Sequence, residues 1–437
     1  MSFANAYAAK LTTPETAVAS IASGEKLCMA MAIGEPPALL KAVADRAEAG
    51  EIADLRLYYF ESKPHAAQTV LRYELLDRIR PHCMFLTGIE RELMRRGREE
   101  GRRVIEFIPT AFSRSPRLLA DLGMDTLVTA VSPMDRHGYF TFGTNNDYVS
   151  RVARVARRVV VEVNPNMPRV MGESLLHVSE VDAIVEHEAP LLEARVRTPS
   201  ATDEAIAAIV AGMIPDGACL QMGIGGLPDA VARALRGHSD LGVHTELLTP
   251  GLVELMRSGA VTNRKKATFP GRSVFTFAMG DRALYDFIDD NPGISSHPVD
   301  VVNDPRHIAK NDRVVSVNAT LQVDLTGACN SEHISGAQYS GAGGQLDFVR
   351  GAAASRGGLS FICCPSTAGE GKVSRITARL DGPVTTPRND VHFVVTEHGV
   401  AELRGRSTAE RAMALIGVAH PDFRSALTEA ARRDGLI

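Results

Sequence analysis

The strongest constraint in this sequence is a pattern that occurs twice, at a constant offset of 192 residues. Residues 34–43 (GEPPALLKAV) align with residues 226–235 (GLPDAVARAL), and an apolar run precedes each of them, at 26–33 and at 218–224. Each copy predicts a strand, a turn and then a helix that begins at proline, because the first helical turn does not need the missing N–H. A repeat at about half the chain length indicates two related domains.

The 437 residues also exceed the usual length of one domain. Short β-branched runs such as 125–131 and 158–163 alternate with amphipathic stretches, which is typical of α/β layers. We place the boundary in the turn-rich stretch 197–203, giving an N-terminal domain of residues 1–197 and a C-terminal domain of residues 198–437. The predicted fold is therefore two related open α/β domains, an internal duplication, with the active site between them.

Composition excludes several classes of protein. Hydrophobic residues make up 45% and charged residues 23%, and the net charge is −4, so no basic field recruits nucleic acid or anionic membrane. The six cysteines form neither a CxxC motif nor a disulfide framework, and no His, Cys, Asp and Glu set has metal-ligand spacing. We find no signal peptide and no apolar run of about 18 residues. We expect a cytoplasmic protein without a metal site.

The two copies differ at the turn. Met31 and Ile33 of the first copy correspond to Gly223 and Gly225 of the second, so only the second turn leaves its backbone uncovered. A further strand pattern leads to Glu246, and the whole segment has the length of a βαβ unit. If its strands are parallel neighbours, the glycine turn and Glu246 both lie at the carboxyl edge of the sheet, where open α/β folds bind ligands.

Three interpretations fit this segment. A dinucleotide site would use the GxG and an acidic residue 21 positions after Gly225, but Pro228 stands where the third glycine is needed. The segment could also be a tight turn without chemistry. In the third interpretation Glu246 is a nucleophile, and N–H groups of the glycine turn stabilise an oxyanion. A second glycine cluster at 339–348 suits an extended ligand, although hairpins and bulges use such clusters as often.

The motifs in chain order resemble the acetyl-CoA hydrolase/transferase family, the 4-hydroxybutyrate CoA-transferase type of class I CoA-transferases. The itaconate CoA-transferases are one candidate branch of it. The resemblance covers most of the C-terminal half and two segments of the N-terminal half. It rests on residues 132–140, 164–169, 223–231, 244–246, 284–287, 323–327, 340–348 and 395–403.

This resemblance implies that Glu246 attacks an acyl-CoA to give an acyl-glutamyl anhydride, then a glutamyl-CoA thioester, in ping-pong catalysis. It implies CoA as a substrate with no other cofactor, and a homodimer or homotetramer. The positions that it assigns to CoA contact are Gly223, Ile224, Gly225, Gly226, Leu227, Leu321 and Gly344.

The acid substrate is less defined, because residues 55–118 match the family motifs least. Arginines and glutamates alternate between 90 and 103, which is typical of a solvated helix face. Alternatively, an arginine there or Arg114 binds a second substrate carboxylate. We therefore expect a short dicarboxylate acceptor such as itaconate, or else 4-hydroxybutyrate. The alternative function is an acyl-CoA hydrolase that uses the same glutamate.

Weaker candidates remain outside the predicted site. His137 fits a glycine-containing turn, and the basic run 264–266 fits a solvated loop better than a phosphate contact. Glu397 and His398 lack an adjoining glycine loop, so we interpret them as residues that serve domain packing and not catalysis.

Overall fold

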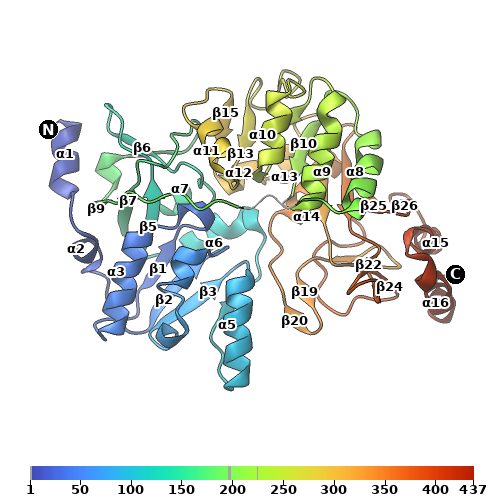
Figure 1. Cartoon of the computed structure of the whole chain (residues 1–437), viewed down its shortest axis with the longest axis horizontal. Helices are drawn as coiled ribbons and strands as arrows, with labels where there is room; N and C mark the ends of the chain where they lie inside the picture. The colour runs from blue at the N-terminus through green and yellow to red at the C-terminus, as the bar shows by residue number, and fades with distance from the viewer. Residues whose placement is uncertain (1, 195–197, 224) are drawn as a thin grey trace. The chain divides into compact units, whose positions relative to one another are not determined.

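The computed structural model describes residues 2–194, 198–223 and 225–437, and the chain divides into two compact units. Unit 1 contains Met1–Ala194 and Thr276–Val301, and unit 2 contains Arg195–Phe275 and Val302–Ile437. Figure 1 shows the elements of each unit. The units differ from the continuous ranges 1–197 and 198–437 in two respects: the first stretch of unit 1 ends at Ala194, and the segment 276–301 also belongs to unit 1.

Backbone hydrogen bonds explain why this segment leaves unit 2. The N–H of Asn146 donates to the carbonyl of Thr276, and the N–H of Ala278 donates to that of Thr144. Near the other end of the segment, the N–H of Glu173 donates to the carbonyl of Ser296. These long-range bonds involve residues with no obvious sequence motif.

Unit 1 is built on a seven-stranded parallel sheet with the order β4-β3-β2-β1-β5-β7-β9. Its core joins strand residues such as Leu27 and Leu57 to helix residues such as Leu39 and Val43. The strands of the sheet are β1 Lys26–Met29, β2 Leu55–Tyr59, β3 Ile79–Cys83, β4 Glu106–Phe107, β5 Thr126–Val131, β7 Arg158–Val163 and β9 Ala183–Glu186.

Helices and short strands complete unit 1. The strands β6 and β8 form an antiparallel pair. The elements are α1 Phe3–Lys10, α2 Pro14–Val18, α3 Pro37–Glu48, α4 Pro64–Ala67, α5 Gly88–Glu99, α6 Ser115–Leu122, α7 Val149–Val152, α11 Arg282–Ile288, β6 Tyr139–Thr141, β8 Leu175–His177, β14 Phe277–Ala278 and β15 Ile294–Ser296. The short helix α12, Val299–Val302, ends at the start of unit 2.

Unit 2 is built on a six-stranded sheet with the order β11-β10-β16-β21-β25-β26, parallel except for β26. Its strands are β10 Cys219–Met222, β11 Gly242–Val243, β16 Val314–Ala319, β21 Leu359–Cys363, β25 Phe393–Thr396 and β26 Gly399–Glu402. The smaller strands are β12 Leu247–Leu248, β13 Ser273–Phe275, β17 Gln322–Asp324, β18 Cys329–Asn330, β19 His333–Ile334, β20 Ala337–Gln338, β22 Thr367–Ala368, β23 Val373–Ser374 and β24 Ile376–Thr377.

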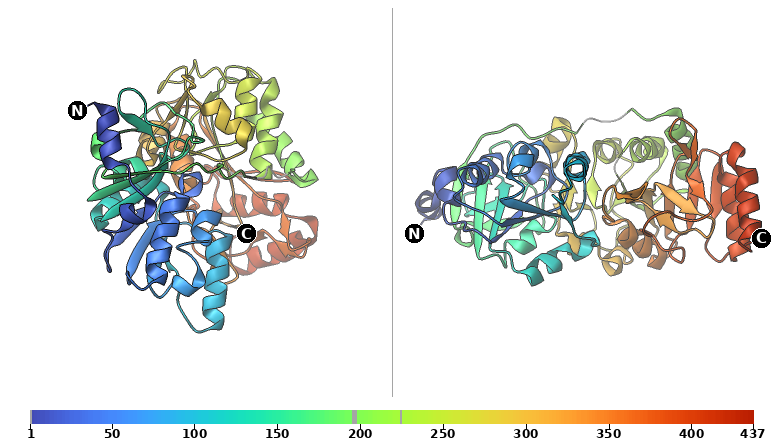
Figure 2. Two further views of the ribbon diagram at one scale, coloured as in Figure 1. Left: turned by 60° about the vertical axis from the view of Figure 1, so that its left-hand side comes forward. Right: turned by 90° about the horizontal axis from the view of Figure 1, so that it is seen from below.

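The helices of unit 2 cover this sheet, and its core joins α14 and α15 to β21 and β25. Helices α15 and α16 pack together at the C-terminus (Figure 2). The helices are α8 Ala201–Met213, α9 Gly226–Ala234, α10 Pro250–Arg257, α13 Pro305–Ile308, α14 Gln345–Ala354, α15 Thr408–Val418 and α16 Pro421–Arg433. Among the residues described, no helix has both the length and the apolar character needed to cross a bilayer.

The strand orders confirm the predicted internal duplication. The order β2-β1-β5-β7-β9 in unit 1 repeats as β11-β10-β16-β21-β25 in unit 2. The register also repeats, since Leu27 lies opposite Thr126 and Cys219, at the offset of 192, lies opposite Val314. A position in one sheet can therefore be compared with its counterpart in the other.

Glu162 on β7 binds the N-terminus of helix α3 in unit 1. The side chain is fully buried, and its Oε2 accepts hydrogen bonds from the N–H groups of Ala38 and Leu39 in the first turn of α3, at 2.9 and 3.0 Å. The Oε1 atom lies 3.4 Å from Nδ1 of His187. Burial raises the pKa of this carboxyl to about 7, although the two N–H donors oppose the shift.

We expect Glu162→Gln to stabilise the protein more at pH 8 than at pH 5. The folded carboxyl keeps its proton up to pH about 7, whereas the unfolded one releases it near 4.5. The wild-type group therefore favours folding below about pH 4.5 and loses that contribution as the pH rises to 7. The amide keeps an oxygen for both donors and has no proton to lose, so the gain at pH 8 is about 1–3 kcal/mol. Thermal unfolding of the wild type and the variant at pH 5 and pH 8 measures this difference in stability. An equal difference at both pH values would contradict the prediction.

Candidate active site

The predicted glycine turn and Glu246 lie at one edge of the unit 2 sheet. Strands β10 and β11 are parallel neighbours, with Cys219 opposite Gly242 and Leu220 opposite Val243. The turn follows β10 and Glu246 follows β11, so both emerge at the carboxyl ends of their strands. This is the edge at which open α/β sheets bind ligands.

The Glu246 carboxylate is held by an amide. Glu246 is half-buried, and Asn303 Nδ2 donates a hydrogen bond of 2.5 Å to its Oε2. Asn303 follows α12 and is fully buried. The amide must present its nitrogen here, because the opposite orientation would set two acceptor oxygens against each other. The sequence analysis missed Asn303, since a single asparagine after an apolar run carries no motif.

Gly344 lies directly against the same carboxylate. A Cβ atom at this position would be 2.0 Å from Oε2 of Glu246 and 2.1 Å from Nδ2 of Asn303. Gly344 immediately precedes α14, and its φ of −102° is open to any residue. Glycine is therefore required here because a side chain would clash with the carboxylate, and not because of the backbone conformation. The structure brings together two residues that the sequence analysis predicted, Glu246 and Gly344.

The glycine turn divides into two parts. The N–H of Gly223 donates to the carbonyl of Val317, so it belongs to the strand ladder between β10 and β16. Gly225, with φ of +124° and open space where a Cβ would lie, is the N-cap of α9. Because the first N–H groups of a helix have no intrahelical acceptor, those of Gly226 and Leu227 suit a developing negative charge better than that of Gly223.

The remaining predicted CoA contacts have different surroundings. Ile224 lies outside the described residues. Leu227 is buried, so its side chain belongs to the core. Leu321 is half-buried; its N–H donates to the carbonyl of Asn330, and its own carbonyl accepts from Arg375 Nη1 at 3.2 Å. Leu321 therefore presents mainly its side chain.

Unit 1 carries a glutamate at the corresponding place. Leu57 and Gly242 occupy equivalent register positions, and Glu61 and Glu246 each follow four residues later. The two carboxylates differ in their partners, because Glu61 forms an ion pair with Lys63 whereas Glu246 accepts from a neutral amide.

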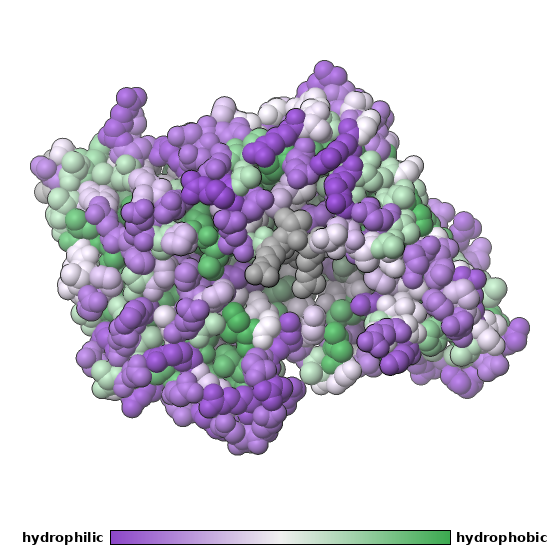
Figure 3. Space-filling model, in the orientation of Figure 1, coloured by the Kyte–Doolittle hydropathy of each residue, from purple (hydrophilic) through white to green (hydrophobic). Residues whose placement is uncertain are grey.

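The arginines around α5 make surface ion pairs. Arg95 pairs with Glu92 and Glu99, Arg96 with Glu74, and Arg102 with Asp77. Figure 3 shows the hydrophilic surface over this helix, at the lower edge of the view. The solvated-face interpretation of these arginines is confirmed, and Arg114 is also exposed.

Two weaker candidates also have structural partners. Lys266 is buried, and its Nζ donates to the carbonyls of Val243 and Arg272, so it cannot meet a phosphate. Glu397 accepts hydrogen bonds from the Ser366 backbone and hydroxyl, at 2.8 and 2.6 Å. The structure thus accounts for both without assigning them a ligand.

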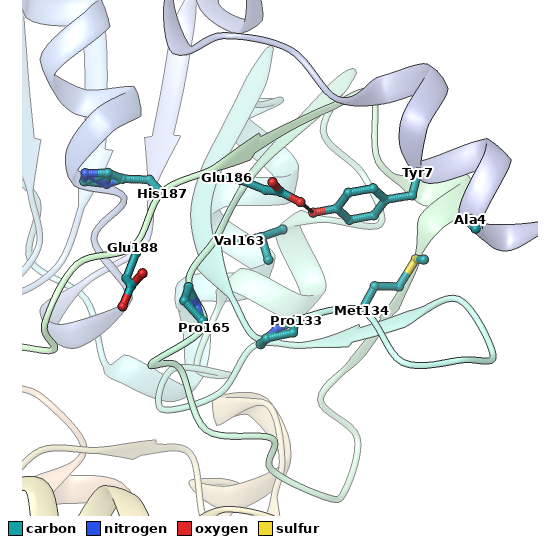
Figure 4. Close-up of a pocket in the computed structure, with 9 residues that line it drawn as sticks. All are labelled: Ala4, Tyr7, Pro133, Met134, Val163, Pro165, Glu186, His187 and Glu188. Atoms are coloured by element: carbon teal, nitrogen blue, oxygen red, sulfur yellow. Dashed lines mark hydrogen bonds between the residues drawn. The ribbon is translucent and has the colours of Figure 1, made fainter.

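A cavity of about 570 Å³ lies elsewhere, at the carboxyl ends of β5, β7 and β9 of unit 1. Its walls include Met134, Pro165 and Glu188 (Figure 4). Tyr7 and Glu186 close one side through a hydrogen bond of 2.6 Å. Of the predicted site residues that the structure describes, none lines this cavity.

Comparison with known proteins identifies the family. The acetyl-CoA hydrolase/transferase N-terminal domain matches residues 1–193, and the acetyl-CoA hydrolase/transferase C-terminal domain matches residues 280–431. The chain belongs to the acetyl-CoA hydrolase/transferase family. The resemblance drawn from the sequence motifs is therefore confirmed.

Individual relatives agree with this assignment to the acetyl-CoA hydrolase/transferase family. The succinyl-CoA:cyclohexane-1-carboxylate CoA transferase of Geobacter metallireducens is 44% identical over 99% of this chain and 97% of its own length. The 4-hydroxybutyrate coenzyme A transferase of Clostridium kluyveri is 42% identical over 98% of each chain. Among solved structures, RipA from Yersinia pestis is 58% identical with a TM-score of 0.98 and full coverage of both chains. A 4-hydroxybutyrate CoA-transferase from Porphyromonas gingivalis is 35% identical with a TM-score of 0.84, covering 99% of this chain and 100% of its own.

Proposed function

We propose that this protein is a CoA-transferase that moves CoA from succinyl-CoA or acetyl-CoA to a short carboxylic acid, with Glu246 as the covalent nucleophile. One observation carries the proposal: the half-buried Glu246 carboxylate is fixed by Asn303 and by the bare backbone of Gly344, beside the glycine turn. A hydrogen bond from a neutral amide orients the carboxylate for attack on an acyl group.

The reaction consists of two exchanges at the same carboxylate. A Glu246 oxygen attacks the acyl carbonyl, the C–S bond breaks, and CoA thiolate leaves an acyl-glutamyl anhydride. The thiolate then attacks the glutamyl carbonyl and expels the first acid, which leaves a glutamyl-CoA thioester. The second acid reverses both steps, and no net proton is taken up. Charge that develops on the carbonyl oxygens is stabilised by N–H groups at the start of α9.

For the acceptor we propose a short dicarboxylate such as itaconate, with 4-hydroxybutyrate as the second candidate. The relatives named above pair succinyl-CoA with cyclohexane-1-carboxylate in one case and use 4-hydroxybutyrate in another, so both a dicarboxylate and monocarboxylates occur in their names. Competition among itaconate, succinate, 4-hydroxybutyrate, butyrate and acetate measures the preference as kcat/KM. A much higher kcat/KM for the monocarboxylates would rule out the dicarboxylate.

The direct test is mass spectrometry of the protein after incubation with succinyl-CoA or acetyl-CoA and trapping with borohydride or hydroxylamine. A modification on Glu246, absent from Glu246→Ala, is the expected result. No adduct, together with turnover retained in the variant, would place the nucleophile elsewhere. Release of CoA without an acceptor acid would favour the hydrolase named in the family description, which shares the glutamyl intermediate.

Asn303→Asp is expected to move the acid limb of the pH–rate profile to higher pH. A second carboxylate would stand where Nδ2 now lies 2.5 Å from Oε2, and like charges this close raise the pKa of the pair. We expect the rate at pH 7 to fall by about 10²-fold. Asn303→Ala removes the hydrogen bond without adding charge, so it should slow turnover and move the acid limb to higher pH by less than Asn303→Asp does. Initial rates from pH 5 to 9 measure both, and an unshifted profile for Asn303→Asp would refute this account.

A further inference from the structure

Three buried polar side chains form a closed network between β10 and β16, beneath the glycine turn. Gln221 lies directly opposite Ser316 in the parallel register, and Asn318 lies two residues further along β16 on the same face. Ser316 Oγ donates to Gln221 Oε1 at 2.7 Å, and Asn318 Nδ2 donates to the same oxygen at 3.1 Å. Asn318 Nδ2 also donates to Ser316 Oγ at 2.8 Å, and Gln221 Nε2 donates to Asn318 Oδ1 at 3.2 Å.

The same positions in unit 1 are apolar. The shared register makes Met29 the counterpart of Gln221, Val128 the counterpart of Ser316, and Ala130 the counterpart of Asn318. These side chains are 0%, 0% and 3% exposed, against 3%, 0% and 8% for the network residues. Two sheets of the same topology therefore fill equivalent buried sites with different chemistry. The strand pairing in unit 1 forms without polar side chains here, so the pairing by itself does not require the network.

The network stands where the two strands separate. The bond from the Gly223 N–H to the Val317 carbonyl ends the β10–β16 ladder, after which β10 enters the glycine turn and the chain beyond β16 leads to Leu321. A Cβ at Gly223 would lie 3.9 Å from Asn318 Oδ1, so the network reaches the base of the turn. In unit 1 the turn has Met31 and Ile33 in place of the glycines. The polar network and the bare turn thus occur in the same copy.

We propose that Gln221, Ser316 and Asn318 are positioning residues that fix the glycine turn relative to the chain after β16, and so set the affinity for CoA. This rests on the proposed function and on the CoA contacts that the family resemblance implies for residues 223–227 and for Leu321. A closed ring of directional hydrogen bonds permits one arrangement of the two strand ends, whereas methyl groups permit several. Loss of the ring lowers affinity because the turn must then be ordered when CoA binds.

The test installs the unit 1 side chains in unit 2. The variant Gln221→Met/Ser316→Val/Asn318→Ala replaces every member of the network, so no partner is left buried and unsatisfied. We expect the Kd for free CoA and the KM for acyl-CoA to rise about 10-fold or more, while the KM for the acceptor acid stays within about 2-fold. Titration with CoA and two-substrate kinetics measure these values.

Ser360→Val is the matched control. Ser360 lies opposite Ser316 on β21, is fully buried, and its hydroxyl has no hydrogen-bond partner among the described residues. Its counterpart in unit 1 is Val160, so the change is of the same kind one strand away. We expect no change in the Kd for CoA. If the triple variant misfolds, the Kd for CoA of Ser316→Ala can be compared with that of Ser360→Ala instead.

The outcomes separate this inference from the proposed function. Wild-type turnover with an unchanged Kd for CoA in a folded triple variant would overturn the positioning role. Equal rises in the KM for CoA and for the acid, or an equal effect in Ser360→Val, would also overturn it in favour of general packing. Absence of any acyl-CoA turnover in the wild type would instead overturn the proposed function.

Discussion

Glu246→Gln should lose about 10⁴-fold or more in kcat for CoA transfer, because an amide oxygen does not attack an acyl-CoA and the covalent route is lost. The glutamine keeps the volume of the side chain and an oxygen that can accept from Asn303 Nδ2, which now lies 2.5 Å from Oε2. The loss should therefore appear in kcat with little change in fold. Steady-state rates of acyl-CoA formation, at saturating donor and acceptor, measure it.

Two controls accompany this prediction. The thermal unfolding midpoint and the Kd for CoA of Glu246→Gln should stay near the wild-type values, since the substitution removes a charge from a half-buried site. Trapping with borohydride should give no adduct on the variant. Turnover within about 10-fold of the wild type would mean that another group forms the covalent bond.

Gly344→Ala should lower kcat/KM by about 10²- to 10³-fold while the protein still folds. The new methyl would lie 2.0 Å from Glu246 Oε2 and 2.1 Å from Asn303 Nδ2, so the carboxylate and the amide must both move. A displacement of about 1 Å is enough for a loss of this size, because covalent catalysis depends on the approach of the attacking oxygen. The backbone at Gly344 accepts alanine without strain, since its φ is −102°.

Gly212→Ala provides the control for that change. Gly212 lies within α8 of unit 2, and a Cβ there would meet no atom within 4 Å. Alanine is the better helix former, so this variant should keep full activity and gain about 0.5–1 kcal/mol in stability. Wild-type activity in Gly344→Ala would show that the contact with Glu246 is not needed for turnover.

The duplication gives these experiments an internal reference. Unit 1 and unit 2 share strand order and register, yet one has a glutamate paired with lysine and the other a glutamate held by an amide. The same contrast separates the apolar sites at Met29 and Val128 from the network at Gln221 and Ser316. Positions at which the two units differ therefore identify side chains of unit 2 that the shared fold does not require.

Local pattern alone was sufficient for the α/β class, the repeat and the edge of the sheet at which Glu246 lies. Strand and turn signals act over a few residues, and parallel neighbours in a βαβ unit must end at the same edge. Gly223 and Gly225 were found for the same reason, since a bare turn after an apolar run is visible in the sequence. Family motifs then added Gly344, which spacing alone could not connect to Glu246.

Only the tertiary structure decided which distant groups meet. Asn303 reaches Glu246 across 57 positions of sequence. The segment 276–301 joins unit 1 through backbone hydrogen bonds, which residues of any type could form. The network of Gln221, Ser316 and Asn318 depends on the register of two strands nearly a hundred residues apart. Such contacts arise from packing and from the need to pair every buried polar group, and neither leaves a periodic signal along the chain.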